Sequence, residues 1–84
     1  MPEHKSPSAA REIFARNLRR VRRLKDMTQE VLALEADMPR AYVSRVERAT
    51  INISIDNADA LAKAVGVPLR DLVDPDKFQG LEDG

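Results

Sequence analysis

Two short helical segments separated by only three residues constrain the fold of this chain more than any other feature. Thr28 is a favourable N-cap for the first segment, which we expect to end near Ala36. Pro39 can open the second segment, Arg40 to Arg48, because proline is tolerated at a helix start. The apolar side chains that we expect the two segments to bury are Val31, Leu32, Ala33, Val43 and Val46.

Three more helices are predicted around this pair. Ser8 caps a helix from Ala9 to about Lys25, and Ser54 caps another over about Ile55–Val65. Gly66 suits the left-handed position after a helix, and Pro68 opens a fifth, short helix. The expected core residues here are Ile13, Phe14, Leu18, Val21, Leu24, Ala58, Leu61, Ala62 and Val65.

The sequence therefore predicts an all-α domain, a compact bundle of five helices. It has no strand pattern and no internal repeat. We expect a flexible N-terminal arm at residues 1–8, the domain at 9–78 and a flexible acidic tail at 79–84.

Composition excludes several classes of site. The chain has 84 residues, no cysteine and one histidine, His4, so a disulfide, a Cys-ligated zinc site and a His-pair metal site are excluded. No nucleophile motif, phosphate loop or metal-ligand spacing indicates an enzyme, a cofactor or a small-molecule ligand. Small domains without disulfides or metal sites often depend on oligomerisation for stability, so we expect a homodimer.

Neither a membrane span nor a signal peptide is predicted. No apolar run approaches the roughly 18 residues that a bilayer requires. Met1–Ser8 lacks the apolar region of a signal peptide, which leads us to expect a cytoplasmic protein.

Charge is distributed unevenly although the net charge is zero. The residues through Arg48 hold 11 Lys and Arg against 7 Asp and Glu, and the residues from Ala49 onward hold 3 against 7. Seven basic side chains lie between Arg11 and Lys25. This asymmetry favours a polyanion-binding surface on the first half, and the alternative is a solvated arginine-rich helix face.

The two short segments have the spacing of a DNA-binding helix-turn-helix, although generic helical hairpins share it. The runs Met27-Thr28-Gln29-Glu30-Val31-Leu32-Ala33 and Pro39-Arg40-Ala41-Tyr42-Val43-Ser44-Arg45-Val46-Glu47-Arg48 resemble the phage Cro/repressor-type helix-turn-helix family, also called the Xre family. Leu61-Ala62-Lys63-Ala64-Val65-Gly66-Val67 and Asp71-Leu72 extend the resemblance, which covers roughly Phe14 to Val73. The second run, with Asn52, is especially similar to controller proteins of restriction–modification systems.

The resemblance implies a lambda-repressor-like fold and a homodimeric transcription regulator that binds an inverted-repeat operator in double-stranded DNA. Two positions depart from the family pattern, because Asp37 and Ala49 stand where it usually has glycine. Aspartate tolerates a left-handed conformation, so we expect the turn at Asp37 to survive. Alanine is penalised in a left-handed conformation, so we expect the loop at Ala49 to differ locally from the family pattern.

Candidate DNA contacts follow from this arrangement. The start of the second segment would face the major groove, where arginine bonds guanine bidentately and a methyl group can touch thymine. The predicted base contacts are Arg40, Ala41, Ser44 and Arg45, with phosphate as the alternative for Arg45. The predicted phosphate contacts are Thr28, Gln29, Tyr42, Arg48 and Asn52, of which Tyr42 could instead cover the core edge.

The resemblance also implies an internal ion pair between Arg22 and Glu47. Their neighbours Arg16, Arg19, Arg20 and Arg23 are then expected to divide between solvent and long-range attraction to DNA. The predicted dimer interface is Leu69, Leu72, Val73 and Phe78, with closure of the monomer core as the alternative for Leu72 and Phe78. An antitoxin-like or other protein-interaction module with the same fold is the alternative function.

Overall fold

Side-chain caps begin three helices at the residues that the sequence predicted. The computed structural model describes residues 8–81. Residues 1–7 of the predicted arm and residues 82–84 of the predicted tail lie outside the described part. Ser8 Oγ accepts the N–H of Arg11 (3.1 Å) at the start of α1, Ala9–Leu24. Thr28 Oγ1 accepts the N–H of Val31 (3.0 Å) at the start of α2, Gln29–Ala36. Ser54 likewise caps α4, Ile55–Val65.

The other two helices begin directly after prolines. α3, Arg40–Glu47, follows Pro39, and α5, Leu69–Leu72, follows Pro68. Within residues 8–81 the secondary structure is helical, with no strand, so the predicted all-α fold of five helices is confirmed. No helix in this range is long and apolar enough to cross a membrane.

A left-handed residue follows each of the two helices α2 and α3. Asp37 has a φ of 57° and ends α2, and the N–H of Met38 bonds Ala33 O at 2.9 Å. The turn thus forms with aspartate, as expected. Ala49 has a φ of 59°, so our expectation of a different local backbone at this position is wrong. The chain keeps the left-handed conformation there despite the steric cost to an alanine.

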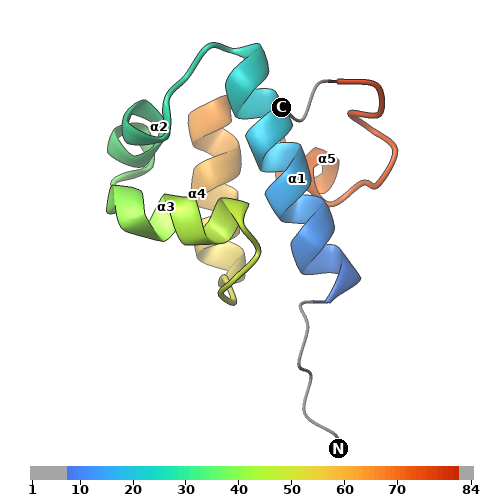
Figure 1. Ribbon diagram of the computed structural model, residues 1–84, viewed down its shortest axis with the longest axis horizontal. Coiled ribbons are helices and arrows are strands. Elements are labelled where there is room, and N and C mark those ends of the chain that lie inside the picture. Colours follow the sequence, from blue (N-terminus) through green and yellow to red (C-terminus); the bar gives the residue numbers. More distant parts are fainter. Residues whose placement is uncertain (1–7, 82–84) are drawn as a thin grey trace, which may run out of the picture.

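The helices surround a single core. α4 contacts α1, α2 and α5, and α3 contacts α1 and α2. Figure 1 shows α2 and α3 on one side of the molecule, with α1 and α5 on the other. The buried apolar residues are Phe14, Ala15, Leu18, Val21, Leu32, Ala33, Val43, Val46, Ala58, Leu61, Ala62, Val65 and Leu72.

Two residues expected in the core lie on the surface. Leu24 is 61% exposed and Val31 is 44% exposed. Leu24 is the last residue of α1, one turn beyond the buried Val21. Val31 precedes the buried Leu32 and Ala33, and three consecutive residues cover too wide an arc of a helix to share one buried face.

A buried asparagine ties the C-terminal segment to α1. Asn17 is fully buried, and its Nδ2 donates to Leu72 O (3.1 Å) and Asp74 O (2.8 Å). These bonds satisfy carbonyl groups that the end of a helix leaves without intrahelical partners. The position of α5 therefore depends on a polar contact as well as on the burial of Leu72.

Candidate nucleic-acid interface

α3 is anchored in the core on one side and polar on the other. Val43 and Val46 are buried, whereas Arg40, Ala41 and Arg45 are exposed. The four predicted base-contact residues span a helical arc of about 140°, with Ser44 half-buried within it. The sequence order thus brings these side chains to the solvent-facing side of one helix.

A buried ion pair fixes α3 relative to α1. Arg22 Nε donates to Glu47 Oε2 at 2.6 Å, and Arg22 Nη2 donates to Glu47 Oε1 at 2.9 Å. Arg22 is 7% exposed and Glu47 is 2% exposed. The structure therefore contains the ion pair that the resemblance implied, in the two-bond geometry that guanidinium and carboxylate groups favour.

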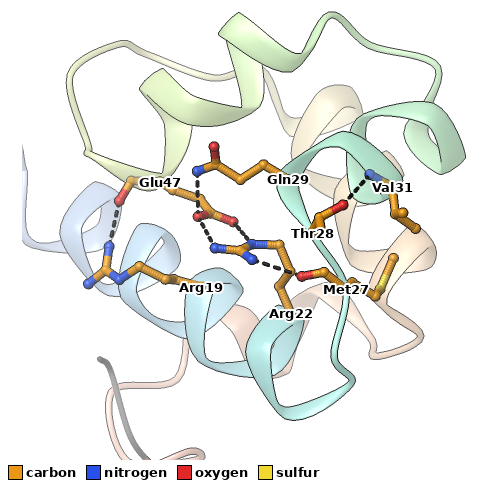
Figure 2. A network of polar contacts seen from close by, with 7 residues as sticks. All are labelled: Arg19, Arg22, Met27, Thr28, Gln29, Val31 and Glu47. Carbon is orange, nitrogen blue, oxygen red and sulfur yellow. Dashed lines mark hydrogen bonds and ion pairs between the residues drawn. The ribbon is translucent and has the colours of Figure 1, made fainter.

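Further bonds extend the pair to α2 (Figure 2). Arg22 Nη1 donates to Met27 O at 2.8 Å, in the connection between α1 and α2. Gln29 Nε2 donates to Glu47 Oε1 at 3.0 Å. Because buried polar groups cost free energy unless they are paired, this network favours one arrangement of α1, α2 and α3.

The two predicted phosphate contacts at the start of α2 differ in their surroundings. Thr28 is exposed, and its hydroxyl oxygen already caps the helix. Gln29 is half-buried with its amide on Glu47, so that side chain lies within the network rather than in open solvent. The Gln29 amide nitrogen carries a second N–H besides the one that Glu47 accepts, and the main-chain N–H groups of the first turn point out of the helix.

The remaining predicted phosphate contacts lie on and after α3. Tyr42 is half-buried against the core, and its hydroxyl oxygen accepts a bond from Asn57 Nδ2 at 3.0 Å. The ring of Tyr42 covers the edge of the core, and its phenolic proton can still be donated to a phosphate. This position is therefore compatible with both predicted roles. Arg48 and Asn52 are exposed, and Asn52 Oδ1 accepts a bond from Arg11 Nη2 at 2.6 Å.

Three arginines of α1 bind main-chain carbonyl groups. Arg19 donates to Glu47 O at 2.6 Å, Arg16 to Pro75 O at 3.0 Å and Arg20 to Phe78 O at 3.4 Å. These three side chains are half-buried and bonded within the fold rather than fully solvated. A carbonyl partner leaves their positive charge in place, so the expected long-range attraction to DNA stays a prediction. Their guanidinium groups reach carbonyls at the end of α3 and in the C-terminal segment.

Sequence reasoning missed the roles of Arg11 and Asn57. Arg11 bonds a loop about 40 residues away, and Asn57 bonds the hydroxyl of Tyr42 from another helix. The charge of Arg11 was counted, but no local spacing signals a partner that only the tertiary fold brings close.

The predicted dimer-interface residues do not form one exposed set. Leu72 is fully buried in the core of the monomer, so its assignment to a subunit interface is wrong. The short α5 places Leu72 towards α1 and α4, which it contacts. Leu69 and Phe78 are half-buried against the same core, and Val73 is 46% exposed.

Comparison with known proteins agrees with this geometry. A family model described as helix-turn-helix matches residues 18–72. The Control protein C.BamHI of Bacillus amyloliquefaciens is 45% identical over 65 residues, which cover 76% of this chain and 80% of that protein. Among solved structures, the hypothetical transcription factor NHTF from Neisseria superposes with a TM-score of 0.79 at 34% identity, covering 92% of this chain and 91% of that one.

A second structural relative was solved with DNA. The restriction–modification controller protein C.Esp1396I, crystallised as a tetramer in complex with its natural 35 base-pair operator, superposes with a TM-score of 0.71 at 26% identity. The match covers 79% of this chain and 96% of that one. The family match spans more than half of the chain and includes α2, the turn and α3. This chain therefore belongs to the Cro/C1-type helix-turn-helix family, together with control proteins of restriction–modification systems.

Proposed function

We propose that this protein is a sequence-specific DNA-binding transcription regulator that inserts α3 into the major groove. The observation that carries the proposal is the exposed polar face of α3 on a helix fixed by the Arg22–Glu47–Gln29 network. A recognition element must be rigid to place its side chains against base edges. The protein acts by binding rather than by catalysis.

In this proposal the predicted residues divide into two roles. Arg40, Ala41, Ser44 and Arg45 contact base edges, with Arg40 as the leading candidate for a bidentate bond to guanine. Thr28, Gln29, Tyr42, Arg48 and Asn52 contact phosphates, which position the protein without specifying sequence. The half-buried Gln29 contributes through the first-turn N–H groups of α2 as well as its amide.

The proposal includes a homodimer and an operator with two inverted half-sites. One recognition helix covers few base pairs, and a two-fold dimer doubles the contacts and places the α3 helices about 34 Å apart, one turn of B-DNA. The names of the relatives support control of a restriction–modification system. We expect this protein to act in the cytoplasm, where the DNA of a bacterium lies. Val73 and the partly covered Leu69 and Phe78 are the proposed contact surface.

Selection of binding sites from a random pool of DNA duplexes tests this function. We expect repeated rounds of binding to enrich one short sequence in two inverted copies. The control is the same pool carried through without protein. Retention of the pool without any enriched sequence would contradict a sequence-specific regulator.

A further inference from the structure

The loop after α3 adopts a conformation that its own residues do not favour. Ala49 stands at a φ of 59°, in the left-handed region that an L-residue with a Cβ rarely occupies. The loop begins with local bonds, in which Thr50 N–H and Thr50 Oγ1 both donate to Arg45 O at 3.1 Å. These bonds hold its first residues to α3 and do not reach Asn52.

Arg11, in the first turn of α1, spans the next part of this loop. Its Nη1 donates to Ala49 O at 3.2 Å, and its Nη2 donates to Asn52 Oδ1 at 2.6 Å. The two nitrogens belong to one planar guanidinium group, so they set the spacing between the carbonyl of Ala49 and the side chain of Asn52. A lysine has one nitrogen at its tip and would not reproduce this fork.

The bond from Arg11 also determines which way the Asn52 amide faces. A guanidinium group has donors only, so Asn52 must turn its oxygen towards Arg11. The amide nitrogen then lies on the side away from Arg11, and Asn52 is exposed. An outward N–H group can donate to an anion, whereas an outward amide oxygen would repel one.

The loop is well placed to meet a DNA strand. It follows the C-terminal end of α3, and the end of a groove-bound helix lies near the phosphates that flank the groove. Arg45 and Arg48 are exposed on the adjoining part of α3 and its C-cap. A donor at Asn52 therefore lies next to cationic side chains on the proposed DNA-binding side.

We propose that Arg11 is a positioning residue for DNA binding, and this inference rests on the proposed function. Arg11 holds the loop after α3 and orients Asn52 so that its amide N–H groups meet a phosphate of the DNA backbone. Arg11 acts through Asn52 rather than by its own contact with DNA, because both terminal nitrogens of its guanidinium group already donate to Ala49 and Asn52.

A double-mutant cycle tests this coupling. The variants are Arg11→Ala, Asn52→Ala and the double variant, and the probe is a duplex of mixed sequence titrated by fluorescence anisotropy at several salt concentrations. We expect each single substitution to weaken binding by roughly fivefold, the effect of one hydrogen bond. The double variant should bind no more weakly than either single variant, because both substitutions remove the same contact.

Two controls separate positioning from charge. Arg11→Lys keeps the charge and loses the fork, so it should bind as weakly as Arg11→Ala. Arg23→Ala removes a charge from an exposed position near the other end of α1, so it should bind nearly as well as the unchanged protein. A plot of log affinity against log salt concentration should have the same slope for Arg11→Ala as for the unchanged protein. If Arg11 itself contacted a phosphate, the magnitude of this slope would fall by about 0.9 in Arg11→Ala.

The side-chain amide signals of Asn52 in the NMR spectrum test the orientation without DNA. We expect them to move to the positions of an unbonded asparagine in Arg11→Ala and in Arg11→Lys, with the signals of the helices unchanged. Three outcomes would each overturn this inference and leave the proposed function standing. They are unmoved Asn52 signals, a salt slope of smaller magnitude in Arg11→Ala, and an effect of Arg11→Ala that remains in full when Asn52→Ala is already present. Failure of the unchanged protein to bind any duplex would overturn the proposed function as well.

Discussion

At the scale of single residues, Glu47 links three helices through one buried carboxylate. It accepts two bonds from Arg22 and one from Gln29. Such a group is costly to bury alone but is compensated when every oxygen has donors. The placement of α3 therefore depends on a polar contact, and truncating either Glu47 or Arg22 alone would leave the other charge buried.

Glu47→Ala is expected to destabilise the fold by about 3–5 kcal/mol, because Arg22 would remain buried without its counter-ion. Thermal unfolding followed by circular dichroism measures this loss, at about 4–8 °C per kcal/mol for a domain of this size. The matched control replaces both partners, as Arg22→Met with Glu47→Leu, and should recover part of the loss. A melting temperature equal to that of the unchanged protein would remove Glu47 from this structural role.

Gln29→Ala is expected to weaken specific and non-specific DNA binding by about the same factor, because phosphate contacts carry no sequence information. Affinities for a selected site and for a scrambled duplex, measured at one salt concentration, provide the comparison. Glu35→Ala, on an exposed residue of the same helix, is the control. Because Gln29 also bonds Glu47, the melting temperature of the variant is measured alongside, and a changed sequence preference at an unchanged melting temperature would contradict the assignment.

The residues of the candidate site were predictable to different degrees. Arg40 and Arg45 were placed correctly on an exposed helix face, because that follows from helical periodicity. The bond from Gln29 to Glu47 and the fork of Arg11 could not be predicted, because they join residues 18 to 41 positions apart. Such contacts depend on how the helices pack.

At the scale of elements, capping residues predicted most of the helix starts. Ser8, Thr28 and Ser54 act locally, through an N–H group three residues ahead, so sequence alone identifies them. Burial was less predictable for Leu24 and Leu72. Periodicity identifies the apolar face of a helix, but it does not show where a neighbouring helix stops covering that face, as at Leu24. It also does not show whether a short helix such as α5 packs on its own core or on another subunit, which was the question at Leu72.

Ala49→Gly is expected to stabilise the fold by about 0.5–1 kcal/mol. Glycine removes a left-handed strain of about 1–2 kcal/mol, and part of this gain is offset by the freedom of glycine in the unfolded chain. The midpoint of urea unfolding measures the change. Ala60→Gly, the same chemical change in the middle of α4, should instead destabilise by about 1 kcal/mol. A loss of stability in both variants would show that Ala49 is not strained.

Asn17→Ala is expected to destabilise the contact between α1 and α5 by about 1–3 kcal/mol, because the carbonyls of Leu72 and Asp74 lose their donor. Hydrogen exchange should rise first in α5 and the segment after it, ahead of the motif helices α2 and α3. Equal acceleration throughout the domain would mean that α5 unfolds only with the whole molecule.

At the scale of the whole molecule, the predicted dimer depends on a small apolar surface near α5. Val73→Asp should convert a dimer of about 19 kDa, twice the 9.4 kDa chain, into a monomer at micromolar concentration, because the charge would be buried between subunits. Sedimentation equilibrium measures this, with Ile55→Asp as the control, at an exposed residue on the first turn of α4. A dimer that tolerates Val73→Asp would place the interface elsewhere.

The most direct test of the account is the affinity of Arg40→Ala for its selected site and for a scrambled duplex, measured together at one salt concentration. Arg70→Ala, at an exposed arginine of α5, serves as the charge-matched control. If α3 reads base pairs, Arg40→Ala should lose about 1–3 kcal/mol of discrimination per contacted base pair, while the control keeps the ratio of the two affinities. Equal weakening on both duplexes would make Arg40 a phosphate contact and contradict base reading by the start of α3.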